Sequence, residues 1–381
     1  MIIGYDAKRI VRNATGLGSY GRTLVNDIAR LNQGLRLHLY APDKGRDDLR
    51  EQIVSVPGLM FCYPKDCYLP FDKAIWRSHG IVKDLKKDGV QVYHGLSGEL
   101  PLGIRKSGIK SVVTIHDLIF MRHPEFYNWI DTKIYTWKFR QTIREADHII
   151  AVSECTKRDI MAYGHVDEDR ISVIYQSCAP RFNSPSVNYK QSTINSQESI
   201  RMLYGLPKRF ILNVGTIERR KNILLAVKAL AGLPEDLALV IVGRQTTYTN
   251  EVLEYISAHG LSHRVFLLHG VPDDHLPALY AQAEAFVYPS VYEGFGIPVI
   301  EAVSCGLPVV ACTDSCLEEA GGPDCLYVAP DDDEAMAAAI LQVLKGAEGR
   351  EERICRSQDY IRRFEGNDLA SQVLDLYHSL V

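Results

Sequence analysis

The sequence predicts an α/β protein with two doubly wound parallel-sheet domains. Short apolar runs of strand length alternate with longer helix-like segments, which is the pattern of a parallel sheet covered on both faces. The alternation breaks once, in a stretch rich in proline and serine between residues 176 and 197, and then restarts. The chain has 381 residues, of which 46% are hydrophobic, so it is too long for one ordinary core and fits two.

The strands and helices follow from these runs. In the first half the expected strands are Met1–Asp6, Leu35–Tyr40, Leu59–Tyr63, Gln91–His94, Ser111–His116, His148–Val152 and Ile171–Tyr175. The expected helices between them include Ser19–Leu31, Lys73–Lys87 and Trp129–Ala146. In the second half the expected strands are Phe210–Val214, Leu237–Val242, Val265–Leu268, Ala285–Tyr288, Pro308–Ala311 and Leu326–Val328.

These elements predict the domain boundaries. We expect an N-terminal Rossmann-like domain at residues 1–180, a linker at 181–197 and a C-terminal Rossmann-like domain at 198–366. Residues 367–381 form an amphipathic pattern, so we expect a last helix, with the N-terminal domain as the candidate surface for it to pack on. Ligands of such domains sit beyond the carboxyl ends of strands, so we expect the two domains to face each other across a cleft.

Composition excludes several classes of protein. A net charge of −4 argues against binding nucleic acid. No apolar run approaches the roughly 18 residues that span a bilayer, and the N-terminus predicts a strand instead of a signal peptide. We therefore expect a cytoplasmic protein, with peripheral contact at the inner face of the plasma membrane and the oligomeric state left open. Lys83, Lys86, Lys87, Arg140 and Arg144 could form a weak basic patch, although solvated helix faces explain them more simply.

The most informative segment is Ser290 to Ala302, which follows an expected buried strand and opens a helix. Gly294 and Gly296 allow the backbone to approach a ligand, and the amides of a helix N-terminus suit phosphate. Glu293 on the loop and Glu301 one turn into the helix could each accept paired hydrogen bonds from vicinal hydroxyls. An ordinary first-turn acid that complements the helix dipole explains Glu301 equally well.

A second strand end, at Asn213 to Asn222, carries the adjacent cations Arg219, Arg220 and Lys221. Cations at such a corner suit a diphosphate, whose negative charge grows as it departs from a sugar. A solvated basic turn is the alternative.

The string Glu-Gly-Phe-Gly-x-Pro-x-x-Glu-Ala that begins at Glu293 resembles the signature of the GT4 family of GT-B-fold glycosyltransferases. The resemblance implies that Glu293 contacts the donor sugar and that Glu301 holds the nucleotide ribose. It also implies that Gly294, Phe295 and Gly296 touch the sugar and diphosphate through their backbone.

The basic segment is similar to the family's diphosphate-binding motif at Arg220 and Lys221. Many members carry an arginine directly after the glycine, where this chain has Thr216, so more of the phosphate binding falls on Lys221. The family resemblance further implies that the backbone near Val271 meets the nucleobase.

Residues Gly16 to Gly21 satisfy Gly-x-Gly-x-x-Gly, a dinucleotide-binding pattern. That pattern should follow the first strand directly, yet it begins about ten residues after Asp6, and the second strand does not end at an acid. The context weakens an NAD interpretation. The family resemblance implies instead a glycine-rich loop in which Gly16 and Gly18 meet the donor diphosphate, while a plain helix-entry loop remains the alternative.

A strand that ends in His116-Asp117 supplies a further candidate, because histidine can hydrogen-bond a sugar hydroxyl. Asp117 could orient the imidazole or cap the next turn. A lone histidine at a strand end is more often structural, but the resemblance implies that His116 lines the reaction centre. The Asp-x-Asp pattern at Asp331 to Asp333 predicts a helix cap and no metal site.

The resemblance implies a retaining, metal-independent hexosyltransferase that needs no cofactor and is similar to mannosyltransferases of bacterial surface polysaccharides. Its donor would be a GDP- or UDP-linked sugar bound by the C-terminal domain, and its acceptor a saccharide or lipid-linked saccharide bound by the N-terminal domain. His116, Lys221 and Glu293 are the expected catalytic residues. The alternatives are an NAD-dependent oxidoreductase that uses Gly16 to Gly21, a nucleotide-sugar epimerase of the same fold, and a non-catalytic sugar-nucleotide sensor.

Overall fold

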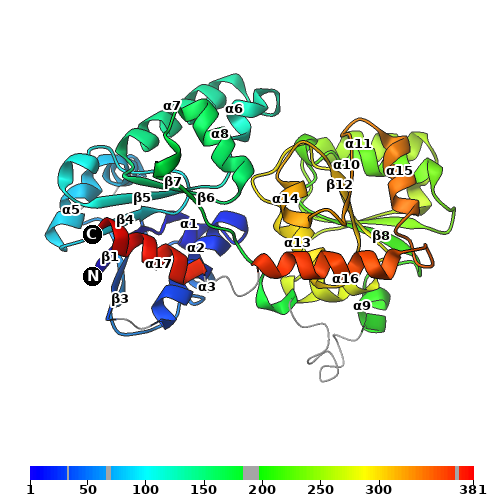
Figure 1. Cartoon of the computed structure of the whole chain (residues 1–381), viewed down its shortest axis with the longest axis horizontal. Helices are drawn as coiled ribbons and strands as arrows, with labels where there is room; N and C mark the ends of the chain where they lie inside the picture. The colour runs from blue at the N-terminus through cyan, green and yellow to red at the C-terminus, as the bar shows by residue number, and fades with distance from the viewer. Residues whose placement is uncertain (32–33, 66–69, 183–196, 365–368) are drawn as a thin grey trace. The chain divides into compact units, whose positions relative to one another are not determined.

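The computed structural model describes residues 1–31, 34–65, 70–182, 197–364 and 369–381 (Figure 1). The chain divides into two compact units, Met1–Gln176 with Asn367–Val381, and Ser177–Gly366. Residues 183–196 of the expected linker lie outside the described part of the chain. Within that part, no helix combines the length and the apolar character that crossing a bilayer requires.

The first unit is built on a parallel sheet of seven strands in the order β3-β2-β1-β4-β5-β6-β7. The strands are β1 (Ile2–Asp6), β2 (Arg36–Tyr40), β3 (Leu59–Cys62), β4 (Val92–Gly95), β5 (Lys110–Ile115), β6 (His148–Ala151) and β7 (Ile171–Val173). All seven expected strands are confirmed, because runs of Val, Ile and Leu buried on both faces are characteristic of parallel sheets.

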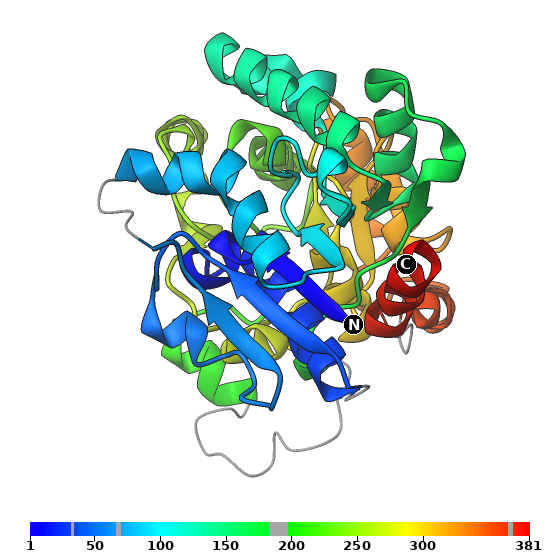
Figure 2. The same cartoon turned by 90° about the vertical axis from the view of Figure 1, so that its left-hand side faces the viewer.

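Helices cover this sheet (Figures 1 and 2). They are α1 (Lys8–Arg12), α2 (Gly16–Arg30), α3 (Asp47–Arg50), α4 (Pro70–Ile75), α5 (Ile81–Lys87), α6 (Ile119–Arg122), α7 (Trp129–Glu145), α8 (Glu154–Gly164) and α17 (Leu369–Leu380). The helix expected at Lys73–Lys87 is confirmed, and a π-helical segment at Trp76–Gly80 lies within it between α4 and α5.

The last helix, α17, packs against α2 in the first unit, so both chain termini belong to that unit (Figure 2). Its apolar stripe, which includes Val373, Leu374 and Tyr377, is buried in the same core as Leu24 and Val25 of α2. The amphipathic pattern of the sequence thus marks the face that the helix buries.

The second unit contains a parallel sheet of six strands in the order β10-β9-β8-β11-β12-β13. The strands are β8 (Phe210–Val214), β9 (Ala238–Val242), β10 (Val265–Leu268), β11 (Phe286–Tyr288), β12 (Val309–Cys312) and β13 (Leu326–Val328), and all six were expected. The helices are α9 (Gln197–Leu203), α10 (Ile223–Ala229), α11 (Tyr248–Ala258), α12 (Leu276–Gln282), α13 (Ile297–Ser304), α14 (Leu317–Gly321), α15 (Asp333–Leu341) and α16 (Arg350–Ile361).

Residues 177–182 belong to the second unit, whereas the sequence placed most of them at the end of the first domain. Cys178 Sγ lies 3.5 Å from Ser304 Oγ, and the ring of Phe182 packs edge-on against Tyr280. Cys178 and Ser304 are more than a hundred residues apart in the sequence, so local composition cannot predict this contact.

Candidate active site

Three of the expected donor residues of the second unit, Arg220, Lys221 and Glu293, come together at the switch point of its sheet. Strands β8 and β11 are neighbours, and the chain proceeds from them toward opposite edges. Ligands of doubly wound sheets bind at the carboxyl ends of such strands. A 3₁₀ turn after β8 (Arg219–Lys221) carries the cations, and the loop after β11 carries Glu293.

Arg220, Lys221 and Glu293 form one largely buried ionic cluster. The ammonium of Lys221 donates to one carboxylate oxygen of Glu293, and the guanidinium of Arg220 lies 2.8 Å from the other. Lys221 Nζ also donates to the hydroxyl of Tyr288 at 2.7 Å, and Arg220 donates to the carbonyl of Tyr292 at 2.7 Å. The cations therefore hold the loop that follows β11, in addition to lying at the switch point.

The cluster keeps its charges at neutral pH. Burial alone would raise the pKa of Glu293, but the neighbouring charges of Lys221 and Arg220 outweigh it and lower that pKa to about 2. Burial opposes the charge of Lys221 too, yet the Glu293 carboxylate raises the pKa of Lys221 above its ordinary value. Glu293 is thus a permanent acceptor that cannot serve as a general acid.

The loop after Glu293 leads tightly into α13. Gly296 has a φ of 110°, which disfavours any other residue, and a Cβ there would lie 2.9 Å from Leu317 Cδ2, so that side chain would also have to move. The ring of Phe295 packs against Phe364, and its carbonyl accepts a hydrogen bond from Cys316 Sγ at 2.9 Å. The side chain of Phe295 therefore belongs to the core, and the expected ligand contact of its backbone stays a prediction.

Glu301 lies on α13, where its carboxylate accepts a hydrogen bond from the hydroxyl of Tyr280 at 3.0 Å. Burial raises the pKa of Glu301 to about 7, against the smaller lowering effect of that hydrogen bond. Val271 is half-buried in the turn that follows β10. Asp273 in the same turn is close enough to Glu301 to raise its pKa further, and it pairs with Arg181 at 3.1 Å.

In the first unit, Gly16 to Gly21 form the first turns of α2, so these residues are helical instead of a loop, and the contact of Gly16 and Gly18 with a donor diphosphate stays a prediction. Close packing of α1 and α2 explains the glycine at position 18, where a Cβ would lie 1.9 Å from the carbonyl oxygen of Asn13. Arg22 donates to the carbonyls of Ile10 at 2.9 Å and Asn13 at 2.8 Å, and so provides hydrogen-bond donors for carbonyl groups at the C-terminal end of α1. Gly16, at a φ of 38°, begins α2, and no atom outside its neighbours approaches its Cβ position within 4 Å.

His116 follows β5 and is half-buried. Its Nε2 donates to the carbonyl of Leu96 at 2.9 Å, and burial lowers its pKa to about 4, so the imidazole is neutral at physiological pH. Because Nε2 carries the proton, Nδ1 is an acceptor. Asp117 accepts from the backbone N–H of Ile119 at 3.2 Å and caps that turn, while the ring of Tyr20 meets the imidazole edge-on at 4.8 Å.

Comparison with known proteins decides the family. The model of glycosyltransferase family 4 matches residues 14–177, and the model of glycosyl transferases group 1 matches residues 199–359. The O-antigen chain mannosyltransferase B of Escherichia coli is 30% identical over 294 residues, which cover 76% of this chain and 74% of that protein. The chain belongs to the GT4 family of glycosyltransferases.

Other relatives agree. The O-antigen chain mannosyltransferase RfbU of Salmonella typhimurium is 29% identical over 261 residues, which cover 68% of this chain and 67% of that protein. The crystal structure of Anabaena Alr3699/HepE in complex with UDP-glucose superposes with a TM-score of 0.74 at 17% identity, and covers 100% of this chain and 99% of that one. The two sheets and this likeness identify the GT-B fold.

The first unit of the glycosyltransferase also contains a network of charged side chains that no sequence motif predicted. At the carboxyl end of β1, Asp6 accepts a hydrogen bond from Arg77 Nη2 at 2.5 Å, and Arg77 also pairs with Glu99. Lys138 Nζ lies 3.0 Å from Glu99. Asp6 at a predicted strand end was the only available signal, because Arg77 and Glu99 come from segments without a recognisable pattern.

The helix cap expected at Asp331 to Asp333 is confirmed. Asp332 accepts from the backbone N–H of Ala335 at 2.8 Å and caps α15. In the described part of the chain, one group with metal-ligand chemistry comes together, formed by His38, Cys62 and Asp88 with ligand atoms within 4.8 Å of one another. The hydroxyl of Tyr40 donates to Asp88 at 2.7 Å, which accounts for this acid without an ion.

Proposed function

We propose that this glycosyltransferase moves a hexose, with mannose as the first candidate, from a GDP- or UDP-linked donor to a saccharide or lipid-linked saccharide acceptor. The observation that carries the proposal is the cluster of Arg220, Lys221 and Glu293 at the switch point of the second unit. Two relatives whose names specify mannosyl transfer support the choice of sugar.

The chemistry would separate a sugar from a diphosphate. The C1–O bond to the diphosphate breaks, the acceptor oxygen forms a bond to C1 on the same face, and the acceptor proton passes to a phosphate oxygen. Arg220 and Lys221 stabilise the negative charge that develops on the diphosphate, in a buried site where such stabilisation is strongest. These fixed cations do the work that a metal would otherwise do, so we propose a metal-independent reaction with retention of configuration.

The remaining groups would bind and orient the donor. Glu293 stays ionised and accepts hydrogen bonds from sugar hydroxyls, and Glu301 accepts from the ribose hydroxyls when it is ionised. His116 offers Nδ1 as an acceptor for a sugar hydroxyl, since Nε2 is held by Leu96. We propose backbone contacts at Gly294, Phe295 and Gly296 for the diphosphate, and at Val271 for the nucleobase.

A panel of donors tests the proposal. Thermal unfolding would be followed with GDP, UDP, GDP-mannose, UDP-glucose and UDP-galactose, and the donor that stabilises the protein most would be given acceptor saccharides, with and without EDTA. We expect one nucleotide to raise the melting temperature, an unchanged rate in EDTA, and a product whose one-bond C1–H1 coupling identifies the same anomer as in the donor.

Two outcomes would contradict the proposal. An inverted anomeric configuration would exclude same-face transfer. Stabilisation and fluorescence enhancement by NADH, with no response to any sugar nucleotide, would favour the oxidoreductase alternative. If the nucleotide sugar is consumed without an acceptor, a purely sensory role is excluded.

A further inference from the structure

Helix α7 presents an unusual exposed face. Trp129 is 66% exposed and Trp137 is 55% exposed, and beside them Ile130 and Ile134 are 49% and 45% exposed. Ile130, Ile134 and Trp137 recur at spacings of four and three residues and Trp129 adjoins Ile130, so the four side chains lie along one side of the helix. Burial of large apolar side chains away from water is favourable, so four of them exposed together on one helix face indicate a docking surface.

Basic side chains lie on the same stripe. Lys133, Arg140 and Arg144 follow Trp129 and Trp137 at helical spacing, and Lys133 Nζ sits 4.8 Å from the centre of the Trp129 ring. In the described part of the chain, neither Arg140 nor Arg144 forms an ion pair, and both are exposed. The stripe therefore combines tryptophan with unpaired arginine, whereas the whole chain is acidic.

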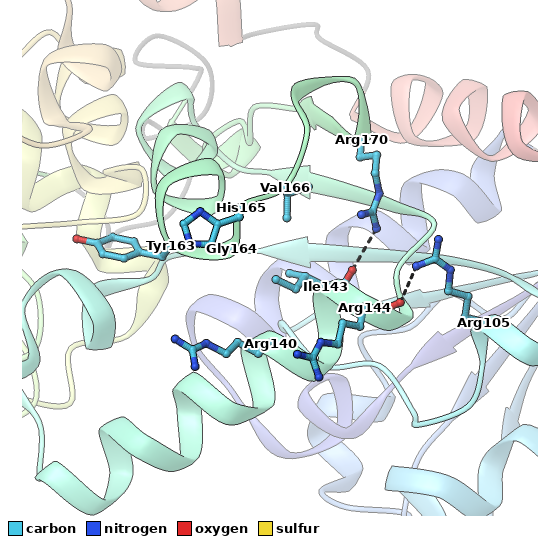
Figure 3. A pocket seen from close by; sticks show the side chains of 9 residues that line it. All are labelled: Arg105, Arg140, Ile143, Arg144, Tyr163, Gly164, His165, Val166 and Arg170. Atoms are coloured by element: carbon cyan, nitrogen blue, oxygen red, sulfur yellow. Dashed lines mark hydrogen bonds between the residues drawn. The ribbon is translucent and has the colours of Figure 1, made fainter.

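The stripe ends in a basic pocket of about 380 Å³ at the carboxyl end of α7 (Figure 3). Arg140 and Arg144 line it together with Arg105, Arg170 and His165, and none of the nine lining residues is acidic. Figure 3 shows Arg105 and Arg170 reaching back to the helix.

These two arginines are held in place by the helix carbonyls. Arg105 donates to the carbonyl of Arg144 at 3.0 Å, and Arg170 donates to the carbonyls of Ile143 at 3.1 Å and Ala146 at 2.6 Å. They stabilise the negative end of the helix dipole, which leaves Arg140 and Arg144 to meet an external anion.

We propose that the α7 stripe and this pocket dock the enzyme onto a bilayer that contains anionic phospholipid. Tryptophan and arginine favour the membrane interface, where an amphipathic side chain keeps its apolar part in the acyl boundary and its polar part among the headgroups. The pocket arginines bind headgroup phosphate. A free phosphate would use these arginines but would leave the tryptophans in water, so a membrane surface accounts for both features. This inference does not depend on the transferase reaction.

Tryptophan fluorescence tests the docking directly. The chain has three tryptophans, and the third, Trp76, is only 8% exposed. The full chain would be mixed with vesicles of brominated phosphatidylcholine that contain either no anionic lipid or 30 mol% phosphatidylglycerol, where 30 mol% is roughly the anionic fraction at which surface attraction is strong. We expect bromine quenching with the anionic vesicles only, and its loss in high salt.

Matched variants locate the surface. Each basic residue near an anionic bilayer contributes roughly a fivefold gain in affinity, so Arg140→Ala/Arg144→Ala should bind roughly 30-fold more weakly. Trp129→Phe/Trp137→Phe should lose the quenching. Lys86→Ala/Lys87→Ala, on the exposed side of α5, removes the same charge elsewhere on the same unit and should bind like the unmodified chain.

Three results would overturn the proposal. Equal quenching by neutral and anionic vesicles would exclude headgroup recognition, and equal loss in the α5 control would reduce the effect to overall charge. Stabilisation by inorganic phosphate without any vesicle binding would assign the pocket to a soluble anion. Thermal unfolding of each variant confirms that it is folded, and nucleotide binding by the second unit remains a separate measurement.

Discussion

Lys221 is half-buried between a carboxylate and a phenol, and the carboxylate of Glu293 stabilises its charge against the effect of burial. Such a cation is already oriented and largely stripped of water before a diphosphate arrives. The interaction should therefore strengthen as charge moves onto the departing phosphate, and contribute more to the transition state than to ground-state binding.

Lys221→Ala should accordingly lower kcat about 100- to 1000-fold, with little change in the KM for the acceptor. The exposed Lys208 supplies the control, since Lys208→Ala removes a charge from the same unit outside the cluster. Steady-state kinetics with donor and acceptor varied separately measures both parameters. Unchanged turnover would remove Lys221 from the proposed mechanism.

Glu301 predicts how nucleotide binding depends on pH. Burial holds its pKa at about 7, so the carboxylate loses acceptor capacity as the pH falls below that value. The affinity for GDP or UDP should decrease between pH 8 and pH 6 through this group. Calorimetric titration of Glu301→Gln should show weaker binding with less dependence on pH, and an unaltered pH profile in that variant would refute the assignment.

The same group affects stability. Its pKa in the folded state exceeds the ordinary carboxyl value, so its contribution to stability is present at low pH and is lost as the pH rises through about 7. Glu293 has the opposite sign, because its lowered pKa gives a contribution that is lost only as the pH falls toward about 2.

Among the elements, α1 and α2 show how residues can match a ligand-binding pattern because of helix packing. The glycines of Gly-x-Gly-x-x-Gly lie in the first turns of α2, and Gly18 lets that helix approach the carbonyl of Asn13. The spacing of these glycines suits close helix packing as well as a phosphate-binding loop. Because the motif begins about ten residues after β1, helix packing is the better explanation.

Gly18→Ala should destabilise the first unit by about 3 kcal/mol, since the new methyl group would overlap backbone atoms that cannot rotate away. Gly16→Ala is the matched control, because its Cβ would meet open space and only the left-handed backbone opposes the substitution, at a cost of about 1 kcal/mol. Urea unfolding of both variants provides the comparison. A Gly18 variant no less stable than the Gly16 variant would show that α1 and α2 are not packed this closely.

At the scale of the whole molecule, the chain returns to its first unit after completing the second. Tyr377 of α17 is fully buried, and its hydroxyl lies 2.5 Å from Nδ1 of His94 on β4. His94 Nε2 in turn lies 2.8 Å from Thr114 Oγ1 on β5, and Thr114 contacts the hydroxyl of Tyr20 at 3.0 Å. The last helix is thereby joined to the strand that leads into His116.

Ending the chain at residue 366 should selectively destabilise the first unit, because Val373, Leu374 and Tyr377 leave its core and His94 loses a buried partner. Hydrogen exchange should accelerate in β1, β4 and β5, while the strands of the second unit exchange as before. Ser379→Ala, an exposed change on the same helix, serves as the control. Unchanged exchange in β4 would mean that α17 contributes little to this fold.

The sequence by itself determined the two-sheet architecture and the identity of the ionic cluster. Strands such as Phe210–Val214 were recognisable because a buried parallel strand must be apolar on both faces, a property written in consecutive residues. Lys221 and Glu293 were recognisable because their segments, which follow strands β8 and β11, resemble motifs of a known family, whereas position after a strand left a structural explanation open.

Only the tertiary structure decided how these groups are tuned and where distant segments pack. The pKa of Glu301, the bond between Lys221 and Tyr288, and the burial of the Phe295 ring all depend on partners remote in sequence. The π-helical turn at Trp76–Gly80 lies inside a segment whose local pattern predicts one continuous helix. Local residues specify periodicity and propensity, whereas burial and long-range hydrogen bonds arise only when the chain is packed, and these set the charges and contacts of the site.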